Sequence, residues 1–182
     1  MNIFDIPLYY ISFSKKPILE KKLIETGFTN INHFNAIKGK ELDEYELIQK
    51  KIISSRSFND LKEGRKEHSG IPSKGAIGCS MSHMNLWKKC VDENLPYIII
   101  CEDDVKIKSI SKKDIQKITS ILESSDKSGF ISTSINKDPI YQFWGLHFCI
   151  FSKGACKELI DNFYPIDLQA DYYVAHLATL KR

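Results

Sequence analysis

The sequence lacks the features that mark several large classes of protein. Its 182 residues contain no apolar run long enough to span a bilayer, and no basic residue precedes the first apolar run in MNIFDIPLYYISF. We therefore expect neither a transmembrane protein nor a secretory signal. A net charge of +3 is too small to indicate nucleic-acid binding, although it permits an anionic small substrate. With only 9 Gly and 6 Pro, the composition is that of an ordinary globular protein.

Cysteine pairing signals are also missing. There is no Cys-x-x-Cys pair, and the number of cysteines is odd. This pattern is typical of free, buried thiols in a reducing compartment, so we expect a cytoplasmic protein. The length of 182 residues suits a single domain, 1–182, with a full hydrophobic core. The cysteines are Cys79, Cys90, Cys101, Cys149 and Cys156.

Hydrophobic periodicity predicts alternating strands and helices. The β-α-β-α order of the opening third favours an α/β fold with a mainly parallel sheet flanked by helices. Residues 54–73 are polar and without a sustained period, which predicts a long, flexible loop of the kind that covers a site. Strands are expected at 8–13, 31–37, 97–101, 129–134 and within 140–152, and helices at 17–26, 41–51, 77–91, 115–122 and 152–162.

The stretch YIIICEDDV has an apolar run that ends in three acids. The run predicts a strand buried on both faces, and alternation along it would direct Glu102 and Asp104 to one side and Asp103 to the other. Two carboxylates at the carboxyl end of a strand suit a divalent cation such as Mg²⁺ or Mn²⁺, and open α/β sheets bind ligands at that edge. The alternative is that the acids cap the following turn or pair with Lys106 and Lys108.

A longer segment carries a resemblance to a known family. GAIGCSMSHMNLWKKCVDENLPYIIICEDDV, residues 75–105, resembles the central signature of glycosyltransferase family 25, the lipooligosaccharide galactosyltransferase-like enzymes. In that family a Gly-Cys-x-x-Ser-His-x-x-x-Trp stretch precedes an apolar strand that ends in Glu-Asp-Asp. The stretches IPLYYISFSKK, FNAIKG and FSKGACKELIDNFYPID extend the resemblance over most of the chain.

The resemblance implies an inverting glycosyltransferase with a GT-A-like (Rossmann-like) fold. Such an enzyme would transfer a sugar, with galactose expected, from a UDP-sugar to a lipooligosaccharide or lipopolysaccharide acceptor. It implies Mn²⁺ or Mg²⁺ at Glu102 and Asp104, because a cation must neutralise the charge that develops on the departing diphosphate. It also implies work at the cytoplasmic face of the inner membrane, with peripheral contact to that membrane and no nucleic-acid partner.

An inverting transfer needs a carboxylate base near the acceptor hydroxyl. The candidates are Asp167 and Asp171 in PIDLQADYY. If this segment is helical, their spacing of four residues places them on one face, where one would orient the acceptor and the other would take its proton. The alternative is that Asp167 caps a helix that follows Pro165 while Asp171 is solvated.

Four polar residues are candidates for contacts with the donor. Ser12, Ser14 and Lys15 follow the first strand, where a nucleotide approaches in the implied fold. Asp103 is the remaining member of the acidic cluster. Lys15 is equally suited to a solvated helix start, and lysine stands here where arginine is common in the family, so a bidentate phosphate contact is lost.

Histidine and aromatic residues supply the remaining candidates. His83 lies on the flank of an apolar helical stripe and would border the site; the alternative is a structural histidine bonded to a backbone carbonyl. Cys79 and Cys90 share that flank, but a zinc site lacks a fourth ligand, and Cys79 is expected to be a small core residue. His147 would complete the metal shell or touch the diphosphate, and Trp144 would stack on a sugar, with packing in a strand as the alternative for both.

Two other functions remain open. The chain ends at DYYVAHLATLKR, sooner than members of the family generally do. A catalytically incomplete member that acts as a nucleotide-binding or complex-forming subunit is therefore the main alternative. A metal-dependent phosphohydrolase is a third reading, because haloacid-type phosphatases also place two acids one residue apart after an apolar strand. Their first acid is an aspartate nucleophile, whereas this chain has Glu102.

Overall fold

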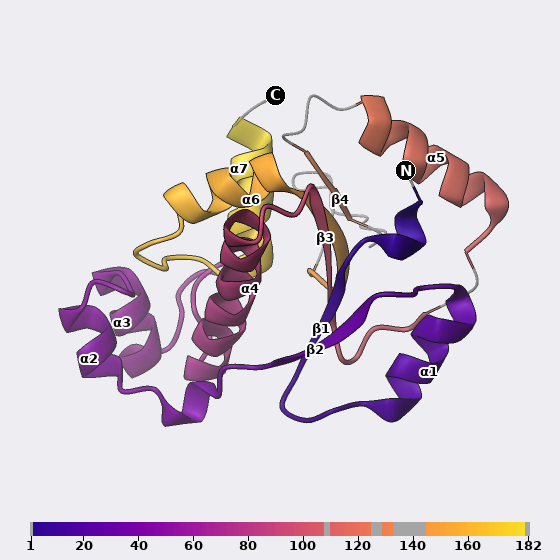
Figure 1. The fold of residues 1–182 in the computed structure, drawn as a ribbon. Coiled ribbons are helices and arrows are strands. Elements are labelled where there is room, and N and C mark those ends of the chain that lie inside the picture. The colour runs from indigo at the N-terminus through magenta and orange to yellow at the C-terminus, as the bar shows by residue number, and fades with distance from the viewer. Residues whose placement is uncertain (1, 108–109, 125–128, 133–144, 181–182) are drawn as a thin grey trace.

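The computed structural model describes residues 2–107, 110–124, 129–132 and 145–180. These residues form one α/β domain in which helices cover both faces of a five-stranded sheet (Figure 1). One hydrophobic core lies on each face of the sheet. None of the helices in the described ranges is long and apolar enough to cross a membrane.

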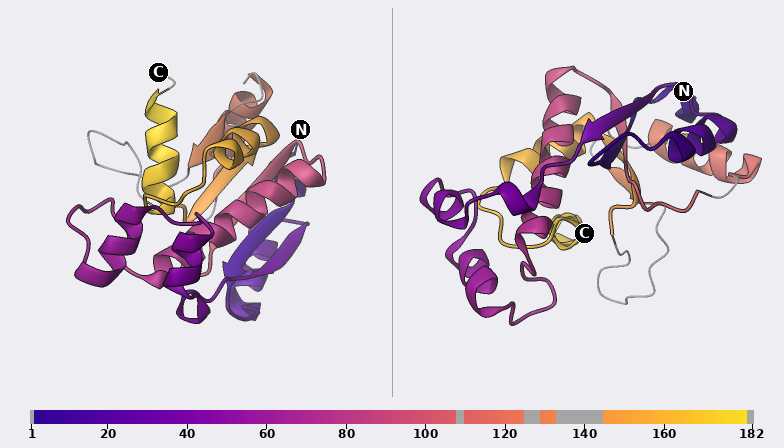
Figure 2. Two further views of the ribbon diagram at one scale, coloured as in Figure 1. Left: turned by 90° about the vertical axis from the view of Figure 1, so that its left-hand side faces the viewer. Right: turned by 90° about the horizontal axis from the view of Figure 1, so that it is seen from below.

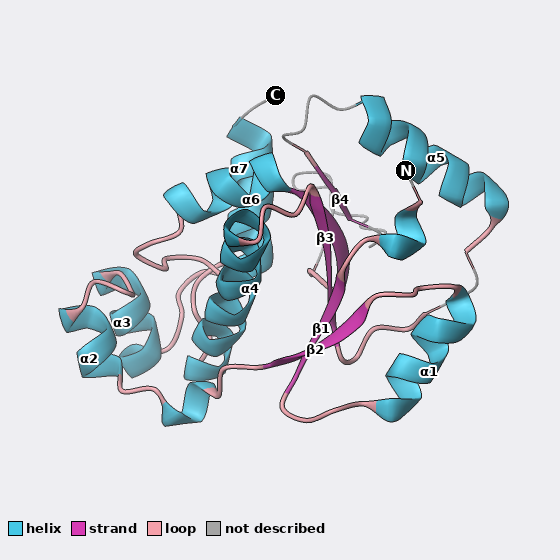
Figure 3. Cartoon of the chain, viewed as in Figure 1, coloured by secondary structure: helices cyan, strands magenta, loops and turns pink. Residues whose placement is uncertain are grey.

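The sheet is mixed rather than mainly parallel. Its order is β2-β1-β3-β5-β4, with β1 parallel to both of its neighbours and β5 antiparallel to both of its own. Figure 3 shows the strands in magenta between the helices. The predicted parallel sheet is thus correct for one half only, because a strand buried on both faces has the same apolar pattern in either direction. The strands are β1 (Leu8–Ser12), β2 (Ile31–Asn35), β3 (Tyr97–Glu102), β4 (Phe130–Ser132) and β5 (Phe148–Ser152).

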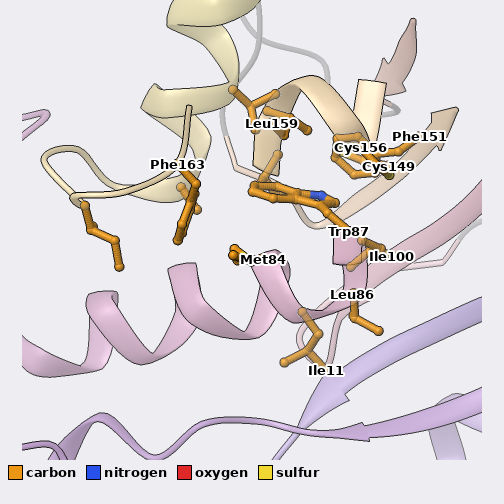
Figure 4. Close-up of a cluster of buried hydrophobic side chains, with 14 of the residues drawn as sticks. Ile11, Met84, Leu86, Trp87, Ile100, Cys149, Phe151, Cys156, Leu159 and Phe163 are labelled. Carbon is orange, nitrogen blue, oxygen red and sulfur yellow. The ribbon is translucent and has the colours of Figure 1, made fainter. Parts of the chain in front are cut away.

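The larger core lies on the face that carries the predicted apolar stripe. Trp87 is fully buried at its centre and makes edge-on ring contacts with Phe151 and Phe163 (Figure 4). Ile77 and Met84 of the same stripe are also buried, so the predicted orientation of this helix towards the sheet is confirmed. The helices on this face are α4 (Lys74–Asp92), α6 (Lys153–Asp161) and α7 (Ala170–Leu180).

The second face of the sheet is covered by α1 (Pro17–Thr26) and α5 (Lys112–Ser124), with the 3-10 turn η1 (Ile3–Asp5) beside them. The bounds of α1 agree with the sequence signals. Pro17 occupies its first turn, and Gly27 ends it with φ 113°, in the left-handed region that glycine adopts without strain. The helix therefore returns the chain to β2 as expected.

Residues 54–73 are not the long loop that the sequence predicts. Their first half forms α3 (Ser55–Glu63), which Ser54 caps by accepting a hydrogen bond from the backbone N–H of Ser57. The helix is mostly polar and packs on the larger core through the half-buried Phe58 and Leu61, so its apolar period is too sparse to recognise. With η2 (Gly39–Glu41) and α2 (Glu44–Gln49) it lies on the side of α4 that faces away from the sheet (Figure 2).

Candidate active site

The acidic cluster lies where β3 ends. Glu102 is the last residue of that strand, and Asp103 and Asp104 form the turn after it. The carboxylate of Asp103 pairs with Lys16 at 2.8 Å, beside the end of β1, whereas Asp104 lies on the side of His147. The predicted separation of Asp103 from its two neighbours is therefore confirmed. The alternative pairing of the acids with Lys106 is not seen among the described residues, where Asp103 pairs with Lys16, and Lys108 lies outside them.

Three side chains converge beside the end of β3. The Oε2 atom of Glu102 lies 2.9 Å from Nδ1 of His147, and the same nitrogen lies 3.5 Å from Oδ1 of Asp104. All three ligand atoms lie within 4.8 Å of one another. An octahedral ion bound at about 2.05 Å separates adjacent ligand atoms by about 2.9 Å, so this set is close to the geometry that Mg²⁺ or Mn²⁺ requires. The two carboxylates are the oxygen ligands that such ions prefer, and the imidazole of His147 supplies a third ligand atom.

Backbone contacts set the position of His147. The N–H of Glu102 donates to the carbonyl of His147 at 3.1 Å, which joins the end of β3 to the residue that precedes β5. Gly145, two residues earlier, adopts φ 72°, and a Cβ atom there would lie 2.5 Å from Nε2 of His147. A larger residue at 145 would therefore displace the imidazole from Glu102.

The other carboxylate oxygen of Glu102 faces helix α4. Oε1 lies 3.2 Å from Nε2 of the fully buried His83 and accepts a hydrogen bond from Sγ of Cys79 at 3.8 Å. The partner of His83 is thus a carboxylate, and within the described residues the ring makes no hydrogen bond to a backbone carbonyl. Cys79 is half-buried and borders a pocket, so it is not the core residue that the sequence suggests.

Burial and pairing act in opposite directions on this pair. Burial disfavours the charged form of His83, but contacts with Cys79 and Glu102 outweigh burial and raise the pKa of His83 to about 9. Burial also works against the charged form of Glu102, yet His83 and His147 hold the pKa of this carboxyl below its usual value. Both shifts favour a charged His83 beside an ionised Glu102.

A pocket of about 340 Å³ connects these side chains to the start of α7. Asp171 is the second residue of α7 and is half-buried, and its Oδ2 accepts a hydrogen bond from the N–H of Gly145 at 3.2 Å. The predicted base candidate thus faces the same space as Glu102 and His147. The pocket is lined by Ala76, Cys79, Glu102, Gly145, Leu146, His147, Gln169, Ala170 and Asp171.

Asp167 lies apart from this pocket. Helix α7 begins at Ala170, so Asp167 precedes it, and the predicted shared helical face with Asp171 does not exist. Asp167 instead accepts a hydrogen bond from Ser54 and lies 3.5 Å from Arg56, at the start of α3. Its partners are on another helix, so it is not a base candidate.

The residues predicted to contact the donor differ in exposure at the end of β1. The end of β1 meets the site because Ile11 is in register with Glu102, but Ser12 is buried and its hydroxyl donates to the carbonyl of Ser14 at 2.5 Å. Ser14 and Lys15 are exposed at this edge. Lys16, which pairs with Asp103, was missed, and its place just before α1 was the available signal. Trp144 lies outside the described residues.

The residues of the Gly-Cys-x-x-Ser-His stretch on α4 make two sets of contacts, one with the loop after β2 and one with Glu102. Gly78 lets α4 approach the loop after β2, because a Cβ there would lie 2.5 Å from the carbonyl oxygen of Ile37. The hydroxyl of Ser82 accepts a hydrogen bond from the N–H of Ile37 in the same loop at 2.9 Å. It also donates to the carbonyl of Gly78 within α4 at 2.7 Å. Cys79 and His83 occupy the adjacent positions and contact Glu102. The helix thus ties the β2 loop to the acidic cluster.

Comparison with known proteins identifies the family. The chain matches the family described as glycosyltransferase family 25 (LPS biosynthesis protein) over residues 6–148. It is 24% identical to a glycosyltransferase 25 family member of Drosophila melanogaster, over 88% of this chain and 29% of the relative. It is 25% identical to procollagen galactosyltransferase 1 of Danio rerio, over 72% of this chain and 26% of the relative.

A third relative is similar over a short segment. This is the lipooligosaccharide biosynthesis protein lex-1 of Haemophilus influenzae, 56% identical over 39 residues, which make up 21% of this chain and 13% of the relative. The matches to the Drosophila and Danio proteins span less than a third of those proteins. Since the family match covers most of its length, the chain belongs to glycosyltransferase family 25.

Proposed function

We propose that this chain is an inverting, metal-assisted glycosyltransferase of GT-A-like fold. It would transfer galactose from a UDP-sugar to a lipooligosaccharide or lipopolysaccharide acceptor. Membership of family 25 and the names of its relatives, a procollagen galactosyltransferase and a lipooligosaccharide biosynthesis protein, support this choice. The observation that carries the proposal is the one pocket that brings Glu102, His147 and Asp171 together.

The donor would bind along the edge formed by the ends of β1 and β3. Glu102, Asp104 and His147 would hold Mn²⁺ or Mg²⁺, which offsets the charge of the departing UDP when it is bound. Asp104 and His147 are exposed enough to share such an ion with the oxygens of a diphosphate. Ser14 and Lys15 are exposed beyond the end of β1 and would contact the nucleotide.

Asp171 would act as the base. Its carboxylate would take the proton of the acceptor hydroxyl while the hydroxyl oxygen forms a bond to the anomeric carbon of the sugar. The bond from that carbon to the diphosphate oxygen breaks on the opposite face, so the configuration inverts and UDP leaves with the electron pair. The hydrogen bond from the N–H of Gly145 fixes the carboxylate at the pocket before the acceptor arrives.

The reaction is proposed to take place at the cytoplasmic face of the inner membrane. Anionic glycolipid acceptors are presented there, and a protein of net charge +3 would make peripheral contact with that surface without repulsion.

The assay that tests the proposal compares two aspartates of the same segment. Transfer from UDP-galactose to purified lipooligosaccharide, with Mn²⁺, is measured for the wild type, Asp171→Asn and Asp167→Asn. Loss of a general base lowers the rate by about 10²–10⁴-fold, so Asp171→Asn should be inactive while it still binds UDP. Asp167→Asn is the matched control and should retain transfer, because its partners are Ser54 and Arg56. Unchanged turnover of Asp171→Asn would remove this residue from the role of base.

A further inference from the structure

The buried side of Glu102 carries a second group of potential ligands. Cys79 and His83 lie one turn apart on α4, and both contact the Oε1 atom of Glu102. The three ligand atoms lie within 4.8 Å of one another. This group is separate from the Asp104 and His147 side chains, which lie on the side of the Oε2 atom.

We propose that Cys79, His83 and Glu102 form a binding site for a thiophilic divalent cation, with Zn²⁺ as the best-suited ion. The proposal concerns a cation of different chemistry from the one that would assist sugar transfer. It stands whether or not the chain transfers a sugar.

The separations of the ligand atoms match a tetrahedral ion. With Zn–S at about 2.3 Å and Zn–N and Zn–O near 2.1 Å, tetrahedral angles separate N from O by about 3.4 Å and S from O by about 3.6 Å. The observed separations are 3.2 Å between His83 Nε2 and Glu102 Oε1, and 3.8 Å between Cys79 Sγ and the same oxygen. An ion could therefore enter between these atoms with small movements of the side chains.

The ligand types favour zinc over magnesium or manganese. Thiolate and imidazole are soft or borderline ligands that select Zn²⁺, whereas Mg²⁺ binds almost entirely to oxygen. Three protein ligands leave a fourth tetrahedral position, and here it would face the pocket, since Cys79 and Glu102 both line it. The fourth ligand would be water or a group from a bound molecule.

Two features of His83 affect how tightly the site would bind an ion: its burial and, within the described residues, the lack of a partner at its second nitrogen. Its side chain is fully buried with Nε2 directed at Glu102, so little conformational freedom is lost when an ion binds. Its other nitrogen, Nδ1, has no hydrogen-bond partner in the part of the chain that the structure describes. A partner at this nitrogen strengthens metal binding by about 10–100-fold in other sites, so we expect an affinity weaker than that of a structural zinc site.

Cobalt titration tests the site directly. Co²⁺ replaces Zn²⁺ in such sites, and only a cysteine thiolate ligand gives a sulfur-to-cobalt charge-transfer band in the near-ultraviolet. Metal-free wild-type protein, kept reduced and near neutral pH, should develop this band on addition of Co²⁺ and lose it when Zn²⁺ is added. Binding should release protons from both the Cys79 thiol and the protonated His83 ring, because a metal ligand must be a thiolate or a neutral imidazole. The oxygen and imidazole ligands of the Asp104 group cannot produce the band.

Matched variants identify the thiolate. Cys79→Ala and Cys79→Ser should lack the band, and the near-isosteric serine keeps the test valid if the alanine variant unfolds. Cys90→Ala is the control, because Cys90 is on the same helix but fully buried beside Leu95. Cys90→Ala and Asp104→Asn should both retain the band. A folded wild type without the band, a band that persists in both Cys79 variants, or its loss in Cys90→Ala would overturn the proposal.

Failure of this proposal can be told apart from failure of the proposed function. Binding of Mn²⁺ and UDP to Cys79→Ser reports on the oxygen-rich group alone. If wild-type protein binds Mn²⁺ and UDP but shows no cobalt–sulfur band, the zinc site is wrong and the transferase proposal stands. If the band appears but UDP does not bind in the presence of Mn²⁺, the zinc site stands and the transferase proposal is wrong.

Discussion

The metal-free protein should lose stability as the pH rises through the range in which folded His83 releases its proton. Its pKa is about 9 in the folded protein and 6.5 in the unfolded chain, because Cys79 and Glu102 stabilise the charged ring. Below pH 6.5 both states carry the proton and the stabilisation is complete. Between 6.5 and about 9 the folded state binds more protons than the unfolded state, so the free energy of unfolding falls.

The size of the effect follows from the difference between the two pKa values. Each pKa unit is worth about 1.4 kcal/mol, so the contacts of protonated His83 with Cys79 and Glu102 together should contribute about 3 kcal/mol at pH 6 and almost nothing above pH 9.5. His83 is fully buried and the Glu102 side chain is only 24% exposed, so solvent screens this interaction weakly.

Urea denaturation of reduced, metal-free protein measures the effect at both ends of this pH range. His83→Gln is the comparison, because its amide can still donate to Glu102 but does not titrate. The difference in unfolding free energy between the wild type and this variant should shrink by about 3 kcal/mol from pH 6 to pH 9.5. A difference that stays constant across this range would show that folding does not raise the pKa of His83, and the ion pair would be rejected.

Two further changes test the packing that holds the site. Trp87→Ala removes the fully buried ring at the centre of the larger core and should lower the free energy of unfolding by about 3–5 kcal/mol in urea; a loss below about 1 kcal/mol would contradict that position. Gly78→Ala forces a Cβ to within 2.5 Å of the carbonyl of Ile37 and should cost about 1–3 kcal/mol. Gly129→Ala is its control and should change the free energy of unfolding little, because a Cβ added there meets no heavy atom of the described residues within 4 Å. Equal effects of the two changes would refute the close approach at Gly78.

The parts of the site that sequence could predict depend on local rules. An apolar run followed by acids fixes a buried strand whose end emerges at the carboxyl edge of the sheet, and alternation then separates Asp103 from Glu102 and Asp104. The side chains lie as expected, although β3 ends at Glu102, so the turn at Asp103 and Asp104 separates them rather than strand alternation. Caps are equally local, as the start of α1 at Pro17 and its end at Gly27 illustrate.

The parts that sequence could not predict depend on contacts between distant residues. Asp167 was misplaced because its partner Ser54 lies 113 residues away, and the start of α7 at Ala170 has no strong local signal. The pairing of His83 with Glu102 depends on how α4 lies over β3, which periodicity alone does not specify. The reversed direction of β5 was missed for a similar reason, since its apolar pattern carries no direction.

The most direct test of the account is calorimetric binding of UDP with and without Mn²⁺. Wild-type protein should bind UDP only when Mn²⁺ is present, and Asp104→Asn should lose this binding because its carboxylate belongs to the Glu102 and His147 group. Asp103→Asn is the matched control and should keep the Mn²⁺ requirement, since Asp103 pairs with Lys16. UDP binding that is independent of Mn²⁺, or that Asp104→Asn leaves unchanged, would contradict a cation at the end of β3.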